Sequence, residues 1–240
     1  MPTETLLALA LVAVYLFDSA YFLRVGETLV LARGRVLSGL SFGGSFELGG
    51  RRPYLPNPLM PFCVDFRISW ALSGGPTADA GAVGEQMRQH LTALRPVSWV
   101  ATVCLIPIIL VAPVALALHA ELIFLAAVAA SVLAAACGCV IVALRRRDLG
   151  LNGWQVCSVV FVALVCLPCS PNLARAVTLH RKWNLAARDL PQLGFDSSAS
   201  DRIHRQIVTA LSSAKRYVAE ESAEFKAIDE QLRQLGGCNP

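Results

Sequence analysis

Two cysteines three positions apart form the chemical pattern with the most specific spacing in this chain. Cys166 and Cys169 stand in the segment Cys-Leu-Pro-Cys, and this spacing lets two thiols close a disulfide. Thioredoxin-like centres use the same spacing at a helix N-terminus, which stabilises a thiolate. Here both thiols lie in an apolar block without a neighbouring Lys or His. The pair therefore supports a redox hypothesis, and its alternative is a structural function as small apolar side chains.

Asp18 is the second candidate because it is an ionisable residue inside an apolar block. A carboxylate in a membrane helix faces protein or water and is a functional candidate by default. Asp18 also lies near the end of its block, where a carboxylate can reach interfacial water or an arginine. The sequence thus predicts an intramembrane functional residue or, as the alternative, an interfacial one.

The remaining patterns do not support a metal site. Cys137 and Cys139 are two positions apart, so a helix points them to different faces, and no second ligand pair follows at a suitable spacing. The chain contains no phosphate-binding glycine loop, nucleophile elbow or zincin helix. We therefore predict no catalytic residue, metal or cofactor, and favour a non-enzymatic protein. The histidines are scattered: His90, His119, His180 and His204.

Apolar helices are the elements that would position these residues. Val97–Leu118 and Leu122–Leu144 each exceed the roughly 20 apolar residues that cross a bilayer, and only a short turn separates them. This pattern predicts an antiparallel transmembrane hairpin over residues 97–144, with kinks at Pro107 and Pro113. With 55% hydrophobic and 16% charged side chains, the chain also has too few charges for an ordinary soluble domain.

Two further apolar blocks bring the predicted number of transmembrane segments to about four. Residues 1–23 lack the charged start and the cleavage site of a signal peptide, which predicts an uncleaved first transmembrane helix. Residues 145–178 hold a basic loop and a fourth segment, Val156–Val177, interrupted by Pro168 and Pro171. This segment either spans with a broken second half or dips in and returns, and the first alternative is favoured.

Arginines predict which loops are cytoplasmic, because positive charge gathers on that side of membrane proteins. They are concentrated between the first two spans and directly after the third, and none lies before the first span or inside the hairpin turn. The pattern predicts a multi-pass protein of the cell inner (plasma) membrane, surrounded by lipid. A net charge of +4 from such positions argues against a nucleic-acid partner. These residues are Arg24, Arg33, Arg35, Arg51, Arg52, Arg67, Arg88, Arg95, Arg145, Arg146 and Arg147.

Residues 24–72 predict a small β-rich cytoplasmic segment. A proline-rich stretch, Tyr54–Pro61, is incompatible with a helix, and so few strands are marginally stable alone. We therefore expect this segment to rest on the membrane or on a partner. Residues 73–96 predict a linker and then an interfacial amphipathic helix. The predicted strands are Glu27–Arg33, Gly39–Leu48 and Asp65–Trp70.

Residues 179–240 predict a polar tail with one long amphipathic helix. A capping pattern at Ser198–Asp201 begins it and Gly236-Gly237 ends it. Apolar residues recur between them at alternating threes and fours, interrupted at Glu221, which is typical of a coiled coil. Such a stripe binds a partner, a second copy or the β segment. The predicted partner-binding residues are Ile207, Leu211, Val218, Phe225, Ile228 and Leu232.

These patterns together predict a mainly α membrane protein with about four transmembrane segments, a small β-rich extramembrane segment and a long C-terminal amphipathic helix. The leading functional hypothesis is an accessory or assembly subunit that binds a protein partner, or itself, through the β segment and the C-terminal helix. One alternative is a component of a transporter or channel that uses Asp18 and the proline-kinked spans. Another is a membrane thiol-disulfide protein that uses Cys166 and Cys169.

Overall fold

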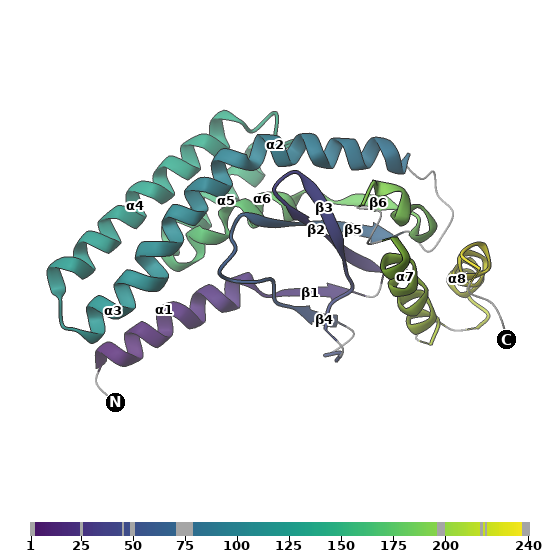
Figure 1. Cartoon of the computed structure of the whole chain (residues 1–240), viewed down its shortest axis with the longest axis horizontal. Coiled ribbons are helices and arrows are strands. Elements are labelled where there is room, and N and C mark those ends of the chain that lie inside the picture. Colours follow the sequence, from purple (N-terminus) through teal and green to yellow (C-terminus); the bar gives the residue numbers. More distant parts are fainter. Residues whose placement is uncertain are drawn as a thin grey trace. The chain divides into compact units, whose positions relative to one another are not determined.

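The helices of the computed structural model follow the apolar blocks and the amphipathic tail, so the chain is mostly helical with a small sheet region (Figure 1). The structure describes residues 3–24, 26–44, 46–48, 51–70, 79–195, 200–216, 218 and 220–236. The helices are α1 (Thr3–Ser19), α2 (Ala80–Leu105), the π-helix η1 (Ile106–Val111), α3 (Ala112–Ala117), α4 (Glu121–Leu144), α5 (Gly153–Val165), the 3₁₀-helix η2 (Leu167–Asn172), α6 (Leu173–His180), the 3₁₀-helix η3 (Ala187–Leu193), α7 (Ser200–Lys215) and α8 (Ala223–Gln234).

Four of the strands form one sheet in the order β3-β2-β5-β6, and β1 pairs with β4 in a second sheet. β2 and β3 are antiparallel, whereas β5 and β6 are parallel, with Ile68 opposite Trp183. The predicted strands at 27–33 and 65–70 are present, and the predicted 39–48 strand is present only at its start, within β3. The strands are β1 (Tyr21–Arg24), β2 (Glu27–Arg33), β3 (Val36–Ser41), β4 (Arg51–Tyr54), β5 (Cys63–Trp70) and β6 (Trp183–Leu185).

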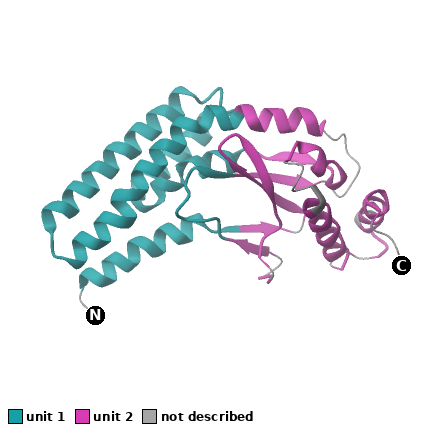
Figure 2. Cartoon of the chain, in the orientation of Figure 1, with its two compact units in different colours: residues 1–21, 55–64, 90–181 teal, residues 22–54, 65–89, 182–240 magenta. Residues whose placement is uncertain are grey.

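The chain divides into two compact units that interleave along the sequence (Figure 2). We call them the helical unit and the strand unit. Each draws on three separate stretches of chain, so the consecutive segments predicted from the sequence are regrouped in space. The helical unit contains Met1–Tyr21, Leu55–Val64 and His90–Arg181, and the strand unit contains Phe22–Tyr54, Asp65–Gln89 and Lys182–Pro240.

Two helical stretches are long and apolar enough to cross a membrane among the described residues, Ala80–Ala117 and Glu121–Leu144. They correspond to the predicted hairpin. α1 has 17 residues and ends at Ser19, because the β-prone residues from Tyr21 onward form β1. The prediction of a helix through residue 23 is therefore wrong. α5 has 13 residues, so the fourth predicted segment is not one continuous helix.

The helices of the helical unit pack through small residues. A Cβ added at Gly138 in α4 would lie 2.7 Å from Leu173 Cδ2 and 3.1 Å from Val100 Cγ1. Glycine at this position therefore lets α4 approach α2 and α6 closely. Pro107 lies in the π-helix η1 and Pro113 lies at the start of α3, which follows it.

The prediction of one long C-terminal helix is wrong, because α7 and α8 are separate helices. The chain turns where Glu221 interrupts the apolar stripe, and this residue is exposed in the turn. Ser222 Oγ then accepts a hydrogen bond from Phe225 N and caps α8. The predicted linker residues 73–78, the capping residues 198–199 and Gly237 lie outside the described residues. Of the predicted stripe, Ile207, Leu211, Ile228 and Leu232 are buried, and Val218 and Phe225 are half-buried.

Candidate functional site

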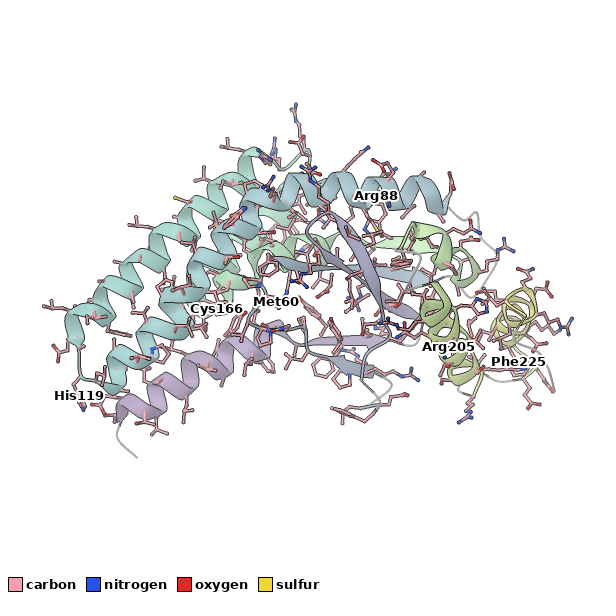
Figure 3. The ribbon with its side chains drawn as sticks, viewed as in Figure 1. Met60, Arg88, His119, Cys166, Arg205 and Phe225 are labelled. Atoms are coloured by element: carbon pink, nitrogen blue, oxygen red, sulfur yellow. A yellow bond between two sulfur atoms is a disulfide. The ribbon has the colours of Figure 1, made fainter. Side chains whose placement is uncertain are left out.

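The predicted thiol pair is joined by a disulfide where α5 passes into η2. Cys166 and Cys169 have their Cα atoms 5.3 Å apart, and Cys169 N donates a hydrogen bond to Cys166 O at 2.8 Å. α5 ends here because Pro168 cannot donate the next helical hydrogen bond. Figure 3 labels Cys166 at this junction. The disulfide therefore closes the tight turn that directs η2.

Asn172, three residues beyond this disulfide, binds the last turn of α1. Its Nδ2 donates to Asp18 Oδ2 at 2.8 Å and to Ser19 Oγ at 2.9 Å. Ser19 Oγ in turn donates to the Tyr15 carbonyl at 2.8 Å. Asn172 and Ser19 are buried, whereas Asp18 is partly exposed. The predicted intramembrane carboxylate is therefore held by an amide.

Arg175 in α6 is fully buried and binds three backbone carbonyls of one loop. Its Nε donates to Cys63 O at 3.1 Å, and its Nη2 donates to Asn57 O and Met60 O at 2.8 and 2.9 Å. A guanidinium stays charged in proteins, so its burial requires such acceptors. All three carbonyls belong to Leu55–Val64, which we call the proline loop (Met60 is labelled in Figure 3). Arg175 therefore fixes the proline loop to α6 within the helical unit.

The amide of Asn172 links the two charged residues. Its Oδ1 accepts from Arg175 Nη1 at 3.3 Å while its Nδ2 binds Asp18. The Tyr15 hydroxyl donates to the Pro58 carbonyl, which adds a second anchor for the proline loop. We call Tyr15, Asp18, Ser19, Asn172 and Arg175 the polar cluster. Its arrangement satisfies buried polar atoms and leaves the Asp18 carboxylate partly exposed.

Sequence reasoning identified Asp18, Cys166 and Cys169 but not the residues that connect them. Asn172 and Arg175 are polar residues at the end of an apolar block, and that position is the signal that marks such residues as candidates. No protein-family model, curated protein or solved structure matches this chain.

The kinked span borders a small apolar cavity. Its volume is about 50 Å³, and its lining includes Leu11, Ile108 and Phe124, with Ser131 as a polar side chain. Ser131 Oγ donates to the Ala127 carbonyl at 2.7 Å, so its hydrogen is used within α4. A cavity of this size has room for one or a few water molecules, but its apolar lining offers them few hydrogen-bond partners.

The other sequence candidates are not brought together. Cys137 is exposed and Cys139 is buried, so the two thiols lie on different faces of α4. Within the described ranges, no group of three or more His, Cys, Asp or Glu side chains could hold a metal ion.

Proposed function

We propose that this chain is a multi-pass accessory or assembly subunit of the cell inner membrane, in which the helical unit is the lipid anchor and the strand unit binds a protein partner. The observation that carries the proposal is the outward-facing apolar surface of the helical unit. Leu118, Leu122, Leu144 and Trp154 are 72–83% exposed to solvent. Monomeric soluble proteins rarely expose apolar patches of more than a few hundred Å², whereas lipid covers such a surface at no cost.

The proposed membrane arrangement has four segments. The two long helical stretches and α1 supply three spans, and the region from α5 to α6 enters the membrane and returns, because the pairing of β6 with β5 keeps the chain before α2 and the chain after α6 on one side. The 17 residues of α1 extend about 26 Å at 1.5 Å per residue, close to the roughly 30 Å of a hydrocarbon core. The arginines after α4 and between α1 and α2 orient their loops toward the cytoplasm.

The polar cluster supports an anchoring function for this part of the helical unit. Arg175 directs its hydrogen bonds to backbone carbonyls of the proline loop and to Asn172, so its charge stabilises an internal contact. A transporter component that uses Asp18 is the competing hypothesis. If Asp18→Asn restores every phenotype of a gene deletion, the transport hypothesis loses its central residue.

Exposed apolar side chains of the strand unit are the proposed contact surface for a protein partner. Phe46 and Leu48 are each 64% exposed, and Leu48 forms an antiparallel bridge to Arg51 at the start of β4. Large exposed apolar residues that stand together at a strand edge favour binding of another chain. The C-terminal stripe remains a second predicted contact, although most of its side chains are buried in the strand unit.

The test is the mass of the complex extracted from membranes at native expression in a mild detergent. We expect a stoichiometric heteromer that is lost in Phe46→Ser with Leu48→Ser. Val36→Ser is the matched control, because Val36 is 55% exposed on β3 of the same unit, and this variant should retain the heteromer. A lone monomer in the wild type, or a heteromer that survives the double substitution, would contradict the proposal.

The disulfide favours a second candidate, a membrane thiol-disulfide protein. If Cys166 and Cys169 exchange electrons with a partner, thiol trapping in growing cells should find both the reduced and the oxidised pair. A pair that is found in one state under every growth condition would leave the disulfide with a structural function.

A further inference from the structure

Three arginines of the strand unit line an open groove of about 530 Å³. They are Arg52 next to Pro53 in β4 and Arg202 and Arg205 on α7 (Arg205 is labelled in Figure 3). The described lining contains no carboxylate, and Gln206 is a further polar side chain there. We call this feature the arginine groove. Its volume lies within the range of roughly 300–1,000 Å³ that is usual for small-molecule sites.

The helical wall of the groove is one face of α7. Arg202, Arg205, Thr209 and Ser213 line it at spacings of three and four residues, which places them above one another on the helix surface. Two like charges at this spacing destabilise an isolated helix slightly. A bound anion would remove that repulsion.

A glycine fixes the opposite wall. Gly43 has a φ of +87°, and an added Cβ would lie 2.7 Å from Arg52 Cβ. Gly44 N donates to the Pro53 carbonyl at 2.6 Å, which ties the end of β3 to β4. The stem of Arg52 is therefore held against the glycine backbone, so the position of the arginine is built into the fold.

We propose that the arginine groove binds a phosphate group, carried either by an anionic phospholipid headgroup or by a soluble phosphate compound. Neither Arg52 nor Arg202 forms an ion pair with a carboxylate in the described part of the chain. Arginines that line two walls of one groove match an anion with oxygens in several directions, and the planar donor fork of arginine suits phosphate. Phe42 and Leu40 add an apolar side to the groove.

The test is isothermal titration of the full chain in a zwitterionic detergent with two probes, inorganic phosphate and dihexanoyl phosphatidylglycerol. Dihexanoyl phosphatidylcholine, whose phosphate is offset by its choline cation, is the comparison with no net charge. Arg202→Gln with Arg205→Gln should weaken binding about tenfold or more, because charge-assisted hydrogen bonds to phosphate are lost. Arg33→Gln with Arg35→Gln is the matched control, since both residues are exposed in the strand unit outside the groove, and it should keep the wild-type affinity.

A second variant keeps the test independent of folding. Arg202→Lys with Arg205→Lys retains both charges and loses the fork geometry, so its affinity should fall between those of the wild type and the glutamine variant. Binding of phosphatidylglycerol alone would assign the phosphate to lipid, and binding of inorganic phosphate would assign it to a soluble compound. The proposal is overturned if neither probe binds, if the glutamine variant and the control lose affinity equally, or if a single-stranded oligonucleotide binds more tightly than both probes.

Discussion

At the scale of single residues, Arg175 is the buried side chain that holds the proline loop to α6. Replacing it by Met removes its hydrogen bonds to the Asn57, Met60 and Cys63 carbonyls, of which the first two keep a backbone donor within the loop. A hydrogen bond to a charged group contributes about 1.5–3 kcal/mol. We expect Arg175→Met to lower the free energy of unfolding by about 3–5 kcal/mol, measured by urea denaturation in detergent with tryptophan fluorescence.

Arg145→Met is the control for that measurement. Arg145 is exposed and donates one hydrogen bond, to the Ala93 carbonyl at 3.4 Å. Its replacement should change the free energy of unfolding by less than about 0.5 kcal/mol. Equal effects of the two substitutions would show that the proline loop does not depend on Arg175.

A surface ion pair gives the α7–α8 hairpin a pH dependence. Lys215 Nζ donates to Asp229 Oδ1 at 2.6 Å, and this bond lowers the pKa of Asp229 below its usual value. The contribution to stability is present above the unfolded pKa of about 3.9 and is lost as the pH falls through the lower folded pKa. The wild type should therefore unfold at a higher temperature than Asp229→Asn at pH 7, with the difference shrinking as the pH falls below the unfolded pKa of about 3.9. A difference that stays constant down to pH 2 would contradict this linkage.

At the scale of elements, replacement by alanine is expected to change stability in opposite directions at two glycines of α2. A Cβ at Gly84 would lie 2.3 Å from the Leu193 carbonyl oxygen at the end of η3, whereas a Cβ at Gly81 would meet only the Asp79 side chain, at 3.6 Å. Gly84→Ala should cost about 1–3 kcal/mol because the helix must move away from η3. Gly81→Ala should be neutral or stabilising by up to about 1 kcal/mol. Thermal unfolding of both variants decides the matter, and equal midpoints would refute the close contact.

Elements with a strong local signal were predictable from the sequence. β2 has the predicted bounds, and α4 covers the predicted Leu122–Leu144 with one residue more. β6 was missed, because its three residues carry no periodicity and it exists only through parallel pairing with β5, more than a hundred residues earlier. The break between α7 and α8 was missed because the apolar period continues on both sides of the turn.

The candidate site was predictable only in its parts. Asp18 and the thiols are recognisable by residue type within apolar blocks. Their connection through Asn172 depends on how α1 meets η2, which is a tertiary contact without a local sequence signal. The anchoring function of Arg175 could not be predicted, because its acceptors are backbone carbonyls and every residue carries one.

At the scale of the whole molecule, the proposed membrane arrangement places the two ends of α4 on opposite sides. The α3–α4 connection holds Ala120 next to His119 (labelled in Figure 3), and Arg147 follows α4. We expect Ala120→Cys to react with a membrane-impermeant maleimide in intact cells, and Arg147→Cys to react only after permeabilisation. The wild type gives the background from native thiols. Equal labelling of both positions in intact cells would show that α4 does not cross the bilayer.

The hydrogen bonds of Arg175 to the proline loop can form only late in synthesis, because the loop is made before Arg175. Asn57 precedes Arg175 by 118 residues in the chain, and ribosomes add about 5–20 residues per second. The proline loop is therefore made roughly 6–24 s before its anchor exists. During that interval water or a chaperone must supply the hydrogen bonds that Arg175 later donates to the loop carbonyls. Nascent chains that stop before residue 175 should consequently be cleaved by protease within the proline loop, whereas released full-length chains resist.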